Sequence, residues 1–386
     1  MRSLRLSSQR ETRYGGGWRR RRSVLLLSAL LFILSESSPS HAFEFRGFGD
    51  VTFTKNDAAG SQNSHGSFTL GQFDLYLTQA ITDRIDVLAE LSIETESEQS
   101  SQTGIDLERL QISYQAKDWL VIRAGRFHNL LGYWNLTFHH GRQLQTTIDR
   151  PSMLFFEDKG GFLPIHLVGL WLGGYVPAGP LLINYGIMAG NGPKITGLDP
   201  ILLNGGSLDP NNAVDNSGNK AVSFNLTFHP LAVHNLGFSV CGNFSQIEGF
   251  DTAGLQVANI NQQILCGELH YVTEAVELLA EYYLLLDTDK LTGLGHFVDQ
   301  SGYVQLAYTF ADKYIPYVRY ERTAVDEGDP YMAMLEIIDT SRTILGFRYN
   351  LSSASSLKAE VRFVNPGVQG KPGNAHVFAV QWAFWF

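Results

Sequence analysis

The chain has 386 residues, a formal net charge of −9 and a mean hydropathy near zero. This length suffices for two soluble domains or one large barrel. The acidic balance argues against nucleic acid as a partner, and two cysteines are too few for a disulfide-rich scaffold. The many aromatic residues and glycines, at this hydropathy, favour a sheet protein whose apolar and polar faces average out.

The first 42 residues have the pattern of a secretory signal peptide. Arg19–Arg22 form a basic region, Val24–Leu34 an apolar region, and Ser40-His41-Ala42 a cleavage site. The apolar region is too short for a helix that spans a membrane, which needs about 20 residues. The paired arginines also fit a twin-arginine signal, but we favour the general secretory route. Cleavage after Ala42 leaves residues 43–386 as the mature chain, with a net charge of −15 once eight arginines and two glutamates are removed.

Apolar and polar residues alternate along most of residues 43–386, which predicts β-strands rather than helices. Short and long connections also alternate, as an all-β, antiparallel up-and-down transmembrane β-barrel with both chain ends on one side requires. Two strands fewer or more remain open, with an even number in each case. The sixteen predicted strands lie near 43–54, 67–80, 83–95, 105–116, 118–128, 164–175, 180–190, 219–229, 234–246, 259–272, 275–287, 299–310, 313–324, 340–350, 355–364 and 373–386. The predicted long connections are 55–66, 96–104, 129–163, 191–218, 247–258, 288–298, 325–339 and 365–372.

Most strands that run into a short connection end on an aromatic residue in the apolar phase. Aromatic rings at one level around a barrel are typical of a membrane interface. These residues are Tyr114, Tyr175, Phe228, Tyr271, Phe310, Tyr349 and Phe386.

The last strand has one apolar face, and the chain ends on it. A soluble protein rarely exposes such a strand, because an exposed apolar edge invites aggregation. If the protein is soluble, the alternative is that this strand is buried in a sandwich. The residues on the apolar face are Phe378, Val380, Trp382, Phe384 and Phe386. This ending resembles the C-terminal signal strand of bacterial outer-membrane β-barrels, which closes the barrel against the first strand. The resemblance implies a Gram-negative outer-membrane location, contact with outer-membrane lipid and lipopolysaccharide, and recognition by the barrel-assembly machinery.

The longest aperiodic connection, 129–163, is the third long one. In trimeric porins, which this plan resembles, that loop folds into the lumen and narrows the pore. A loop of this length with side chains of both charges is unusual unless it has a function. The predicted pore residues on it are His139, His140, Arg142, Asp149, Arg150, Glu157 and Asp158. The adjacent histidines point apart in an extended segment and no third ligand is evident, so they are interpreted as polar loop residues, and neither a metal nor a cofactor is expected.

Basic side chains gather on the predicted lumen face of the last strands. Arg319, Arg348 and Arg362 point inward on three successive strands, Lys358 lies beside Arg362, and closure brings Arg46 near. Separated inward charges orient solutes and set ion selectivity. In the alternative, Arg319–Glu321 and Glu360–Arg362 neutralise one another across neighbouring strands. Inward acids are predicted elsewhere, at Asp74, Asp86, Glu90, Glu268, Glu277 and Glu281.

Cys241 and Cys266 lie on consecutive predicted strands. Opposed residues of an antiparallel pair have position numbers with a constant sum, and the two cysteines fit the predicted strand ends closely. Both side chains fall on the lumen face. The sequence predicts a disulfide, and a reduced pair packed side by side is the alternative.

The stretch Leu120–Leu131, LVIRAGRFHNLL, is followed by Gly132. It resembles a segment of the phosphate-selective porin O/P family, in which a strand of this pattern precedes the third loop. The resemblance implies a sixteen-stranded pore that assembles as a homotrimer. The lysine-rich third loop and the arginine ladder of that family are missing, so phosphate selectivity is not implied.

Catalytic and haem-attachment motifs such as GxSxG, HExxH, the P-loop and CxxCH are absent, so no enzyme is predicted. The expected function is passive diffusion of small hydrophilic solutes or ions through a porin. A first alternative is a barrel that encloses a multihaem cytochrome as an electron conduit, which predicts a wide empty lumen. A second is a receptor or adhesin that acts through its long loops, which predicts a blocked pore.

Overall fold

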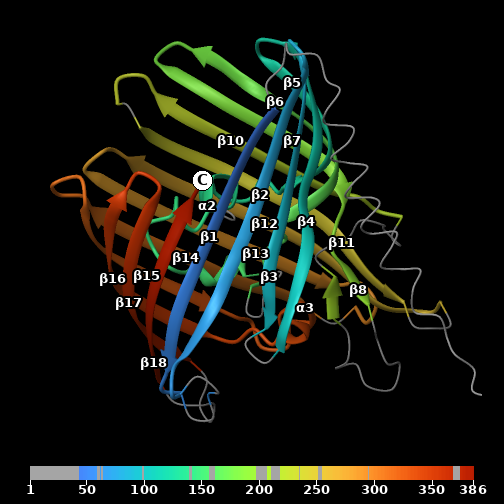
Figure 1. Ribbon diagram of the computed structural model, residues 1–386. Helices are drawn as coiled ribbons and strands as arrows, with labels where there is room; N and C mark the ends of the chain where they lie inside the picture. The colour runs from blue at the N-terminus through green and yellow to red at the C-terminus, as the bar shows by residue number, and fades with distance from the viewer. Residues whose placement is uncertain are drawn as a thin grey trace, which may run out of the picture. The chain divides into compact units, whose positions relative to one another are not determined.

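Sixteen long antiparallel strands close into a barrel in the computed structural model (Figure 1). Their bounds are β1 (Phe43–Asn56), β2 (Ser67–Thr82), β3 (Ile85–Ser97), β4 (Ser100–Lys117), β5 (Leu120–His128), β6 (His166–Ala178), β7 (Leu181–Asn191), β10 (Ala221–Pro230), β11 (Leu236–Phe250), β12 (Gln256–Val272), β13 (Val276–Asp289), β14 (His296–Tyr308), β15 (Tyr314–Ala324), β16 (Thr340–Ser352), β17 (Ser355–Pro366) and β18 (Ala375–Trp385). The short strands β8 (Lys194–Thr196) and β9 (Ser207–Asp209) pair with each other in the connection from β7 to β10. All sixteen predicted strands are confirmed.

The structure describes residues 43–58, 61, 64–97, 100–138, 141–155, 161–196, 207–209, 218–233, 235–250, 254–293, 295–367 and 374–386. The predicted signal peptide therefore lies outside the described residues. Residues Phe43–Phe386 form one unit, and the sections below concern this unit alone.

The barrel closes where β1 pairs with β18. The register runs from Phe48 opposite Trp385 to Asn56 opposite Val377. At the end of the seam, Gly47 and Phe386 exchange backbone hydrogen bonds of 2.9 and 3.0 Å. Because each of the sixteen strands pairs on both sides, the barrel leaves no open edge.

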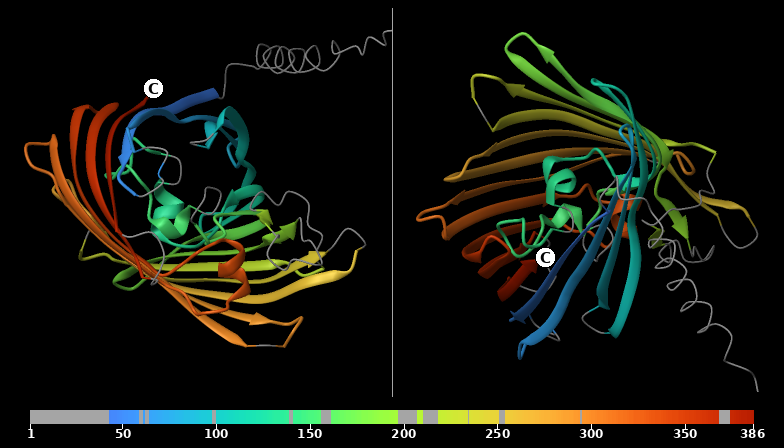
Figure 2. Two further views of the ribbon diagram at one scale, coloured as in Figure 1. Left: turned by 90° about the horizontal axis from the view of Figure 1, so that it is seen from below. Right: turned by 45° about the horizontal axis from the view of Figure 1, so that its top comes forward.

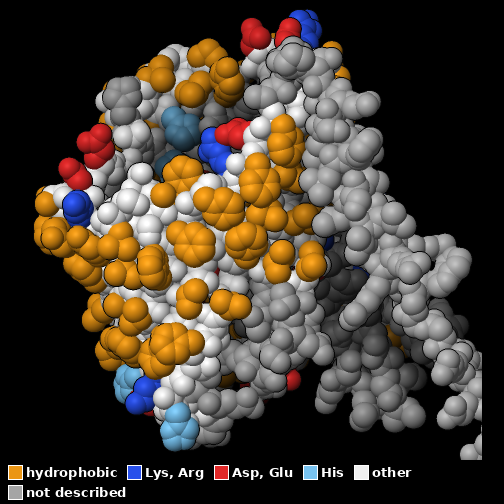
Figure 3. All heavy atoms as spheres, viewed as in Figure 1, with side chains coloured by type: hydrophobic (Ala, Val, Ile, Leu, Met, Phe, Trp, Pro, Cys, Tyr) orange, Lys and Arg blue, Asp and Glu red, His pale blue; other side chains and the backbone are white. Residues whose placement is uncertain are grey.

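Alternate residues of each strand face outward and form an apolar belt. On β18 the large side chains at Phe378, Val380, Trp382 and Phe384 are exposed, whereas Ala379, Gln381 and Ala383 are fully buried. In the face shown in Figure 3, hydrophobic side chains cover the middle of the wall and charged side chains gather near its two ends. This two-sided pattern is the one that a strand between lipid and lumen requires.

Two connections predicted to be long are shorter than expected. The prediction of a long connection at 96–104 is wrong, because β3 continues to Ser97 and β4 begins at Ser100, and these two residues are paired. The connection predicted at 247–258 is also shorter than predicted, because β11 continues to Phe250 and β12 begins at Gln256. Apolar alternation ends where a strand leaves an apolar layer, but backbone pairing continues with polar residues beyond that point.

Helices occur in only two of the described connections. They are α2 (Tyr133–Phe138), the 3-10 turn η1 (Ser152–Leu154) and α3 (Pro330–Met334). No helix among the described residues has the length and apolar character needed to cross a membrane. Figure 2 shows the green segment with α2 inside the ring of strands. The main buried cluster joins side chains of both connections to the barrel wall, including Trp134, Met153, Phe162, Tyr331 and Tyr283.

Candidate functional site

The connection from β5 to β6, here called the inner segment (residues 129–165), turns into the lumen directly after β5. Asn129 fixes the turn, because its backbone N–H donates to the Ile165 carbonyl (2.8 Å) and its side-chain amide donates to the Pro164 carbonyl (2.9 Å). Gly132 has a φ of +78°, and a Cβ atom there would clash with the side chains of Tyr283 and Glu281. Glycine is therefore required where the segment meets the opposite wall.

The helix α2 is fixed to the wall by Glu281 on β13. The carboxylate oxygen Oε1 of Glu281 accepts a bond from the Trp134 backbone N–H (2.7 Å) and another from the Tyr303 hydroxyl (2.8 Å). The Trp134 side chain is 1% exposed, and its ring packs edge-on against Tyr303. Glu281, predicted as a pore-wall acid, is thus a support for the inner segment.

The predicted basic residues of β15–β17 also hold the inner segment. Lys358 Nζ donates to the carbonyl oxygens of Gln145 (2.9 Å) and Thr147 (3.0 Å), and also to that of Arg142. Arg348 Nη1 donates to the Gln145 carbonyl at 2.8 Å. These cations therefore neutralise the partial charges of backbone carbonyls rather than standing free in the lumen.

Arg319 is the most deeply buried of these side chains. It is 0% exposed, and its guanidinium donates to the carbonyl oxygens of Asp149 (3.0 Å) and Arg150 (3.1 Å). Its Nε also pairs with Glu321 at 2.8 Å. The planar five-donor guanidinium suits this arrangement, because it satisfies several acceptors at once.

Arg319 and Arg362 do not stand as unpaired charges in the lumen. Arg319 pairs with Glu321, and Arg362 pairs with Glu360 at 2.8 Å. The alternative of mutual neutralisation describes both, although the partners lie two residues apart on one strand rather than on neighbouring strands. The sequence shows which face a side chain takes, but it does not show which partner the side chain chooses. Residues i and i+2 of one strand share a face and are close enough to pair.

Asp149 on the inner segment receives two guanidinium groups. Arg362 Nη1 lies 2.5 Å from its Oδ2, and Arg342 Nη2 lies 3.3 Å from the same atom. Burial alone would raise the pKa of Asp149, but the charges of Arg362 and Arg342 outweigh it and hold that pKa below its usual value. Arg342 is absent from the predicted site. It lies in the same inward phase of β16 as Arg348, so the alternation could have identified it.

Acids of the wall bind backbone N–H groups and a hydroxyl of the inner segment. Glu360 accepts from the Ile148 N–H (2.6 Å), and Glu321 accepts from the Ser152 N–H (3.0 Å). Glu277 on β13 accepts from the Thr146 hydroxyl at 2.8 Å. The segment is thus held by β13 on one side and by β15–β17 on the other, so it spans part of the lumen.

A cavity of about 400 Å³ remains between α2 and the wall of β1, β2 and β4. Arg46 lines it together with Glu44, with which it forms an ion pair, and the two side chains are 59% and 52% exposed. Arg109, paired with Glu90, adds a third charged side chain. Arg46 therefore faces this cavity, where its contacts are with Glu44 rather than with the arginines of β15–β17.

The other predicted residues fall in several places. Arg142 reaches β1 and β2, with its Nε 3.7 Å from Asp50 and 3.3 Å from the Gln72 amide oxygen. Arg150 is buried and its guanidinium lies over the Phe155 ring. Asp74 and Glu90 are buried in the wall and Asp86 is exposed, while Glu268 accepts a bond from Ser239. The predicted residues His139, His140, Glu157 and Asp158 lie outside the described residues.

Cys241 and Cys266 are opposed in the register of β11 and β12, as the constant-sum argument predicts. Their Cα atoms are 4.9 Å apart, and the structure joins their sulfur atoms. Both residues are buried in the cluster that contains Trp134 and Leu131 of the inner segment. The pair therefore faces the lumen side.

No family model matches the chain, and no curated protein matches it significantly. Solved outer-membrane proteins do match its structure. The outer membrane channel DcaP of Acinetobacter baumannii has a TM-score of 0.61 and 12% identity, over 91% of this chain and 99% of the channel. An anion-selective porin from Comamonas acidovorans has a TM-score of 0.57 and 12% identity, over 90% of this chain and 100% of the porin. OprB of Pseudomonas putida has a TM-score of 0.56 and 13% identity, over 96% and 97% of the two chains. At these identities the likeness shows the fold alone, which is the closed sixteen-stranded barrel of outer-membrane porins.

Proposed function

We propose that the protein is an outer-membrane porin, a passive diffusion channel for small hydrophilic solutes or ions. The observation that carries this proposal is the inner segment, which wall charges hold across part of the lumen beside a cavity with charged walls. A fixed loop of this kind sets a size limit, and charged groups beside it set ion preference.

The outer surface supports a membrane location. Large apolar side chains are exposed on alternate positions around the barrel, including Leu170, Val304 and Trp382, as a surface in contact with lipid requires. Residues 1–42 serve as the cleaved signal peptide in this proposal. The chain then enters a Gram-negative outer membrane through the barrel-assembly machinery and contacts lipid and lipopolysaccharide.

A homotrimer is the assembly that this proposal favours. OmpT of Vibrio cholerae, whose trimer form is solved, has a TM-score of 0.54 to this chain at 11% identity, over 90% of this chain. Phosphate selectivity is not proposed. In the stretch that resembles phosphate-selective porins, both arginines have partners within the protein. The Arg123 guanidinium lies 4.0 Å from the centre of the Trp171 ring, and Arg126 donates to the Glu108 carbonyl at 2.9 Å.

The electron-conduit alternative requires a wide lumen for a cytochrome. The inner segment occupies that space, with Trp134 and Met153 buried against the wall, so the alternative loses its main requirement. The receptor alternative requires a lumen that conducts nothing, which only a conductance measurement distinguishes from the porin.

Single-channel recording in planar lipid bilayers tests the proposal. Folded barrels should give steady open steps, and proteoliposomes should swell in small sugars but not in large ones. A matched variant, Lys358→Met, removes the cation that binds three carbonyl groups of the inner segment, and it should give noisier steps. Folded wild-type barrels that insert but give no current above the lipid background would refute the porin and favour the receptor.

A further inference from the structure

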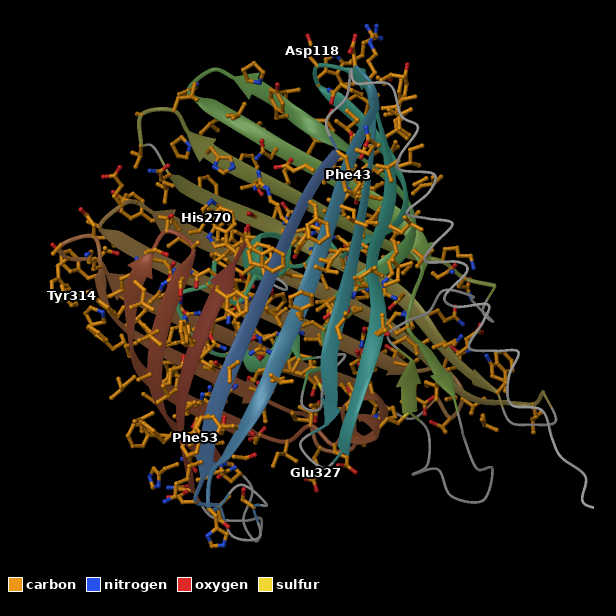
Figure 4. The ribbon with its side chains drawn as sticks, viewed as in Figure 1. Phe43, Phe53, Asp118, His270, Tyr314 and Glu327 are labelled. Atoms are coloured by element: carbon orange, nitrogen blue, oxygen red, sulfur yellow. A yellow bond between two sulfur atoms is a disulfide. The ribbon has the colours of Figure 1, made fainter. Side chains whose placement is uncertain are left out.

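Three buried carboxyl groups meet where the connection 325–339 folds against the wall. Asp287 lies near the end of β13, Asp299 near the start of β14, and Asp329 directly before α3. One oxygen of each lies within 4.8 Å of one oxygen of each of the others, and the residues are 1%, 0% and 1% exposed. We call these three residues the aspartate cluster. Glu327, two positions before Asp329 in the chain, lies in Figure 4 at the end of the barrel opposite Asp118.

Each carboxyl group of the cluster is oriented by an N–H donor on one of its oxygens. Asp329 accepts from the Tyr331 N–H at 2.6 Å, and Asp299 accepts from the Asp326 N–H at 2.7 Å. Asp287 accepts from the Gln262 side-chain amide at 3.2 Å. In each carboxyl group the second oxygen is buried and has no N–H or hydroxyl donor. These second oxygens are the atoms that remain available to a ligand.

Gln262 on β12 provides an independent observation. It is 0% exposed, its amide nitrogen touches the cluster, and its side-chain oxygen Oε1 has no hydrogen-bond partner. A buried amide oxygen without a donor costs about 1–3 kcal/mol, so native structures rarely leave one unsatisfied. A cation in the cluster would satisfy it if the amide turned so that its oxygen, rather than its nitrogen, faced Asp287.

No positive charge among the described residues forms an ion pair with the cluster. None of the ion pairs among the described residues includes Asp287, Asp299 or Asp329. Three carboxylates in one buried site repel one another strongly unless a cation or protons neutralise them.

We propose that the aspartate cluster and Gln262 form a calcium-binding site. Carboxylate and amide oxygens are ligands for hard divalent cations, whereas zinc favours nitrogen and sulfur. The three oxygens, which lie within 4.8 Å of one another, can all contact one cation. Calcium is favoured because it accepts six to eight oxygen ligands in flexible geometry, whereas magnesium demands a near-ideal octahedron.

The bound cation would fasten the connection 325–339 to β12, β13 and β14. This connection carries Tyr331 and Met332, which are fully buried in the main cluster of the lumen. The Tyr331 hydroxyl donates to the carbonyl of Phe162 in the inner segment. Calcium would thus stabilise a second inward connection and, through Tyr331, the inner segment. The sequence does not indicate this site, because its ligands come from four separate elements without a spacing motif.

Isothermal titration calorimetry of the full folded barrel in detergent, after treatment with EDTA, tests the site with calcium chloride as the probe. Wild type should bind one calcium ion, and magnesium chloride should bind more weakly. The double variant Asp287→Asn and Asp299→Asn keeps side-chain size and should give no binding heat. Glu327→Gln, an exposed charge change in the same connection, should bind as wild type does.

A second measurement keeps the proposal falsifiable if the double variant does not fold. Terbium bound to the wild-type site should emit light when tyrosine is excited, because Tyr331 is nearby, and calcium should quench this emission at lower concentration than magnesium. Folded wild type that binds neither calcium nor terbium would overturn the proposal, leaving carboxyl groups that share protons instead. Unchanged calcium binding in a folded double variant would overturn it as well.

Discussion

Arg362 and Asp149 join the barrel wall to the inner segment through an ion pair of 2.5 Å. Arg362 also donates to Glu360, and Asp149 also receives Arg342. One carboxylate of the inner segment is therefore shared by guanidinium groups from β16 and β17. Because both strands belong to the closed barrel, this carboxylate ties the position of the segment to the barrel wall.

Replacing Asp149 by asparagine should loosen the inner segment. Arg362 and Arg342 would keep Glu360 and Glu321 as partners, which limits the loss of stability. We therefore expect the free energy of unfolding to fall by about 1–3 kcal/mol. Current noise in the open channel should rise. Equilibrium unfolding in urea and single-channel recording measure these effects, with Asp118→Asn at an exposed turn as the control. A variant as stable and as quiet as wild type would contradict the role given to Asp149.

The lowered pKa of Asp149 also predicts how acid affects the channel. A depressed folded-state pKa contributes stability above the usual value of 3.8, and this contribution is lost as pH falls through the lower folded value. Wild-type noise should therefore be constant from pH 7 down to that usual value and should rise below it. Recordings at stepwise lower pH test this, and Asp149→Asn should lack the acid-dependent rise.

The strands, their order and the cysteine register were predictable because one simple signal determines them. A side-chain period of two, repeated between lipid and lumen, assigns each residue of a strand such as β18 to one face. Closure then fixes which strands are neighbours. The opposition of Cys241 and Cys266 follows from that register alone.

The partners of the lumen residues were not predictable in the same way. The contact of Arg319 with Asp149 joins residues 170 positions apart, and alternation shows only that Arg319 faces inward. The aspartate cluster has the same difficulty, since Asp329 reaches Asp287 and Asp299 only after its connection folds into the lumen. Such contacts depend on the course of irregular segments, which have no period to detect.

Ion selectivity should respond to the two exposed charges that line the cavity. Arg46→Gln should shift the reversal potential in a potassium chloride gradient toward cations, and Glu44→Gln should shift it toward anions. The double variant removes no net charge and should remain close to wild type. These shifts should shrink at high salt, because salt screens exposed charges. If neither single variant changes the reversal potential, the conducting path does not pass this cavity.

The cysteine pair should be oxidised in the exported protein. Alkylation without reduction, followed by mass spectrometry, should find no modified thiol, and two modified thiols would contradict the bond. The double variant Cys241→Ser and Cys266→Ser should be destabilised by about 3 kcal/mol on the chain-entropy model, for a separation of 25 residues. Conductance should change little, because the register of β11 and β12 also has backbone hydrogen bonds to maintain it.

Barrel closure should depend on the terminal residue, Phe386. Its backbone exchanges two hydrogen bonds with Gly47, and its ring stacks on Phe73 with centroids 5.9 Å apart. Phe386→Ala removes the ring contact alone, whereas deletion of Phe386 also removes both backbone bonds at the seam. The folded fraction, measured as the heat-modifiable band on a gel, should therefore fall in the order wild type, Phe386→Ala, deletion. Phe378→Ala removes an exposed ring from the middle of the same strand and serves as the control. Equal losses in Phe378→Ala and Phe386→Ala would mean that the apolar face as a whole, rather than the seam, determines assembly.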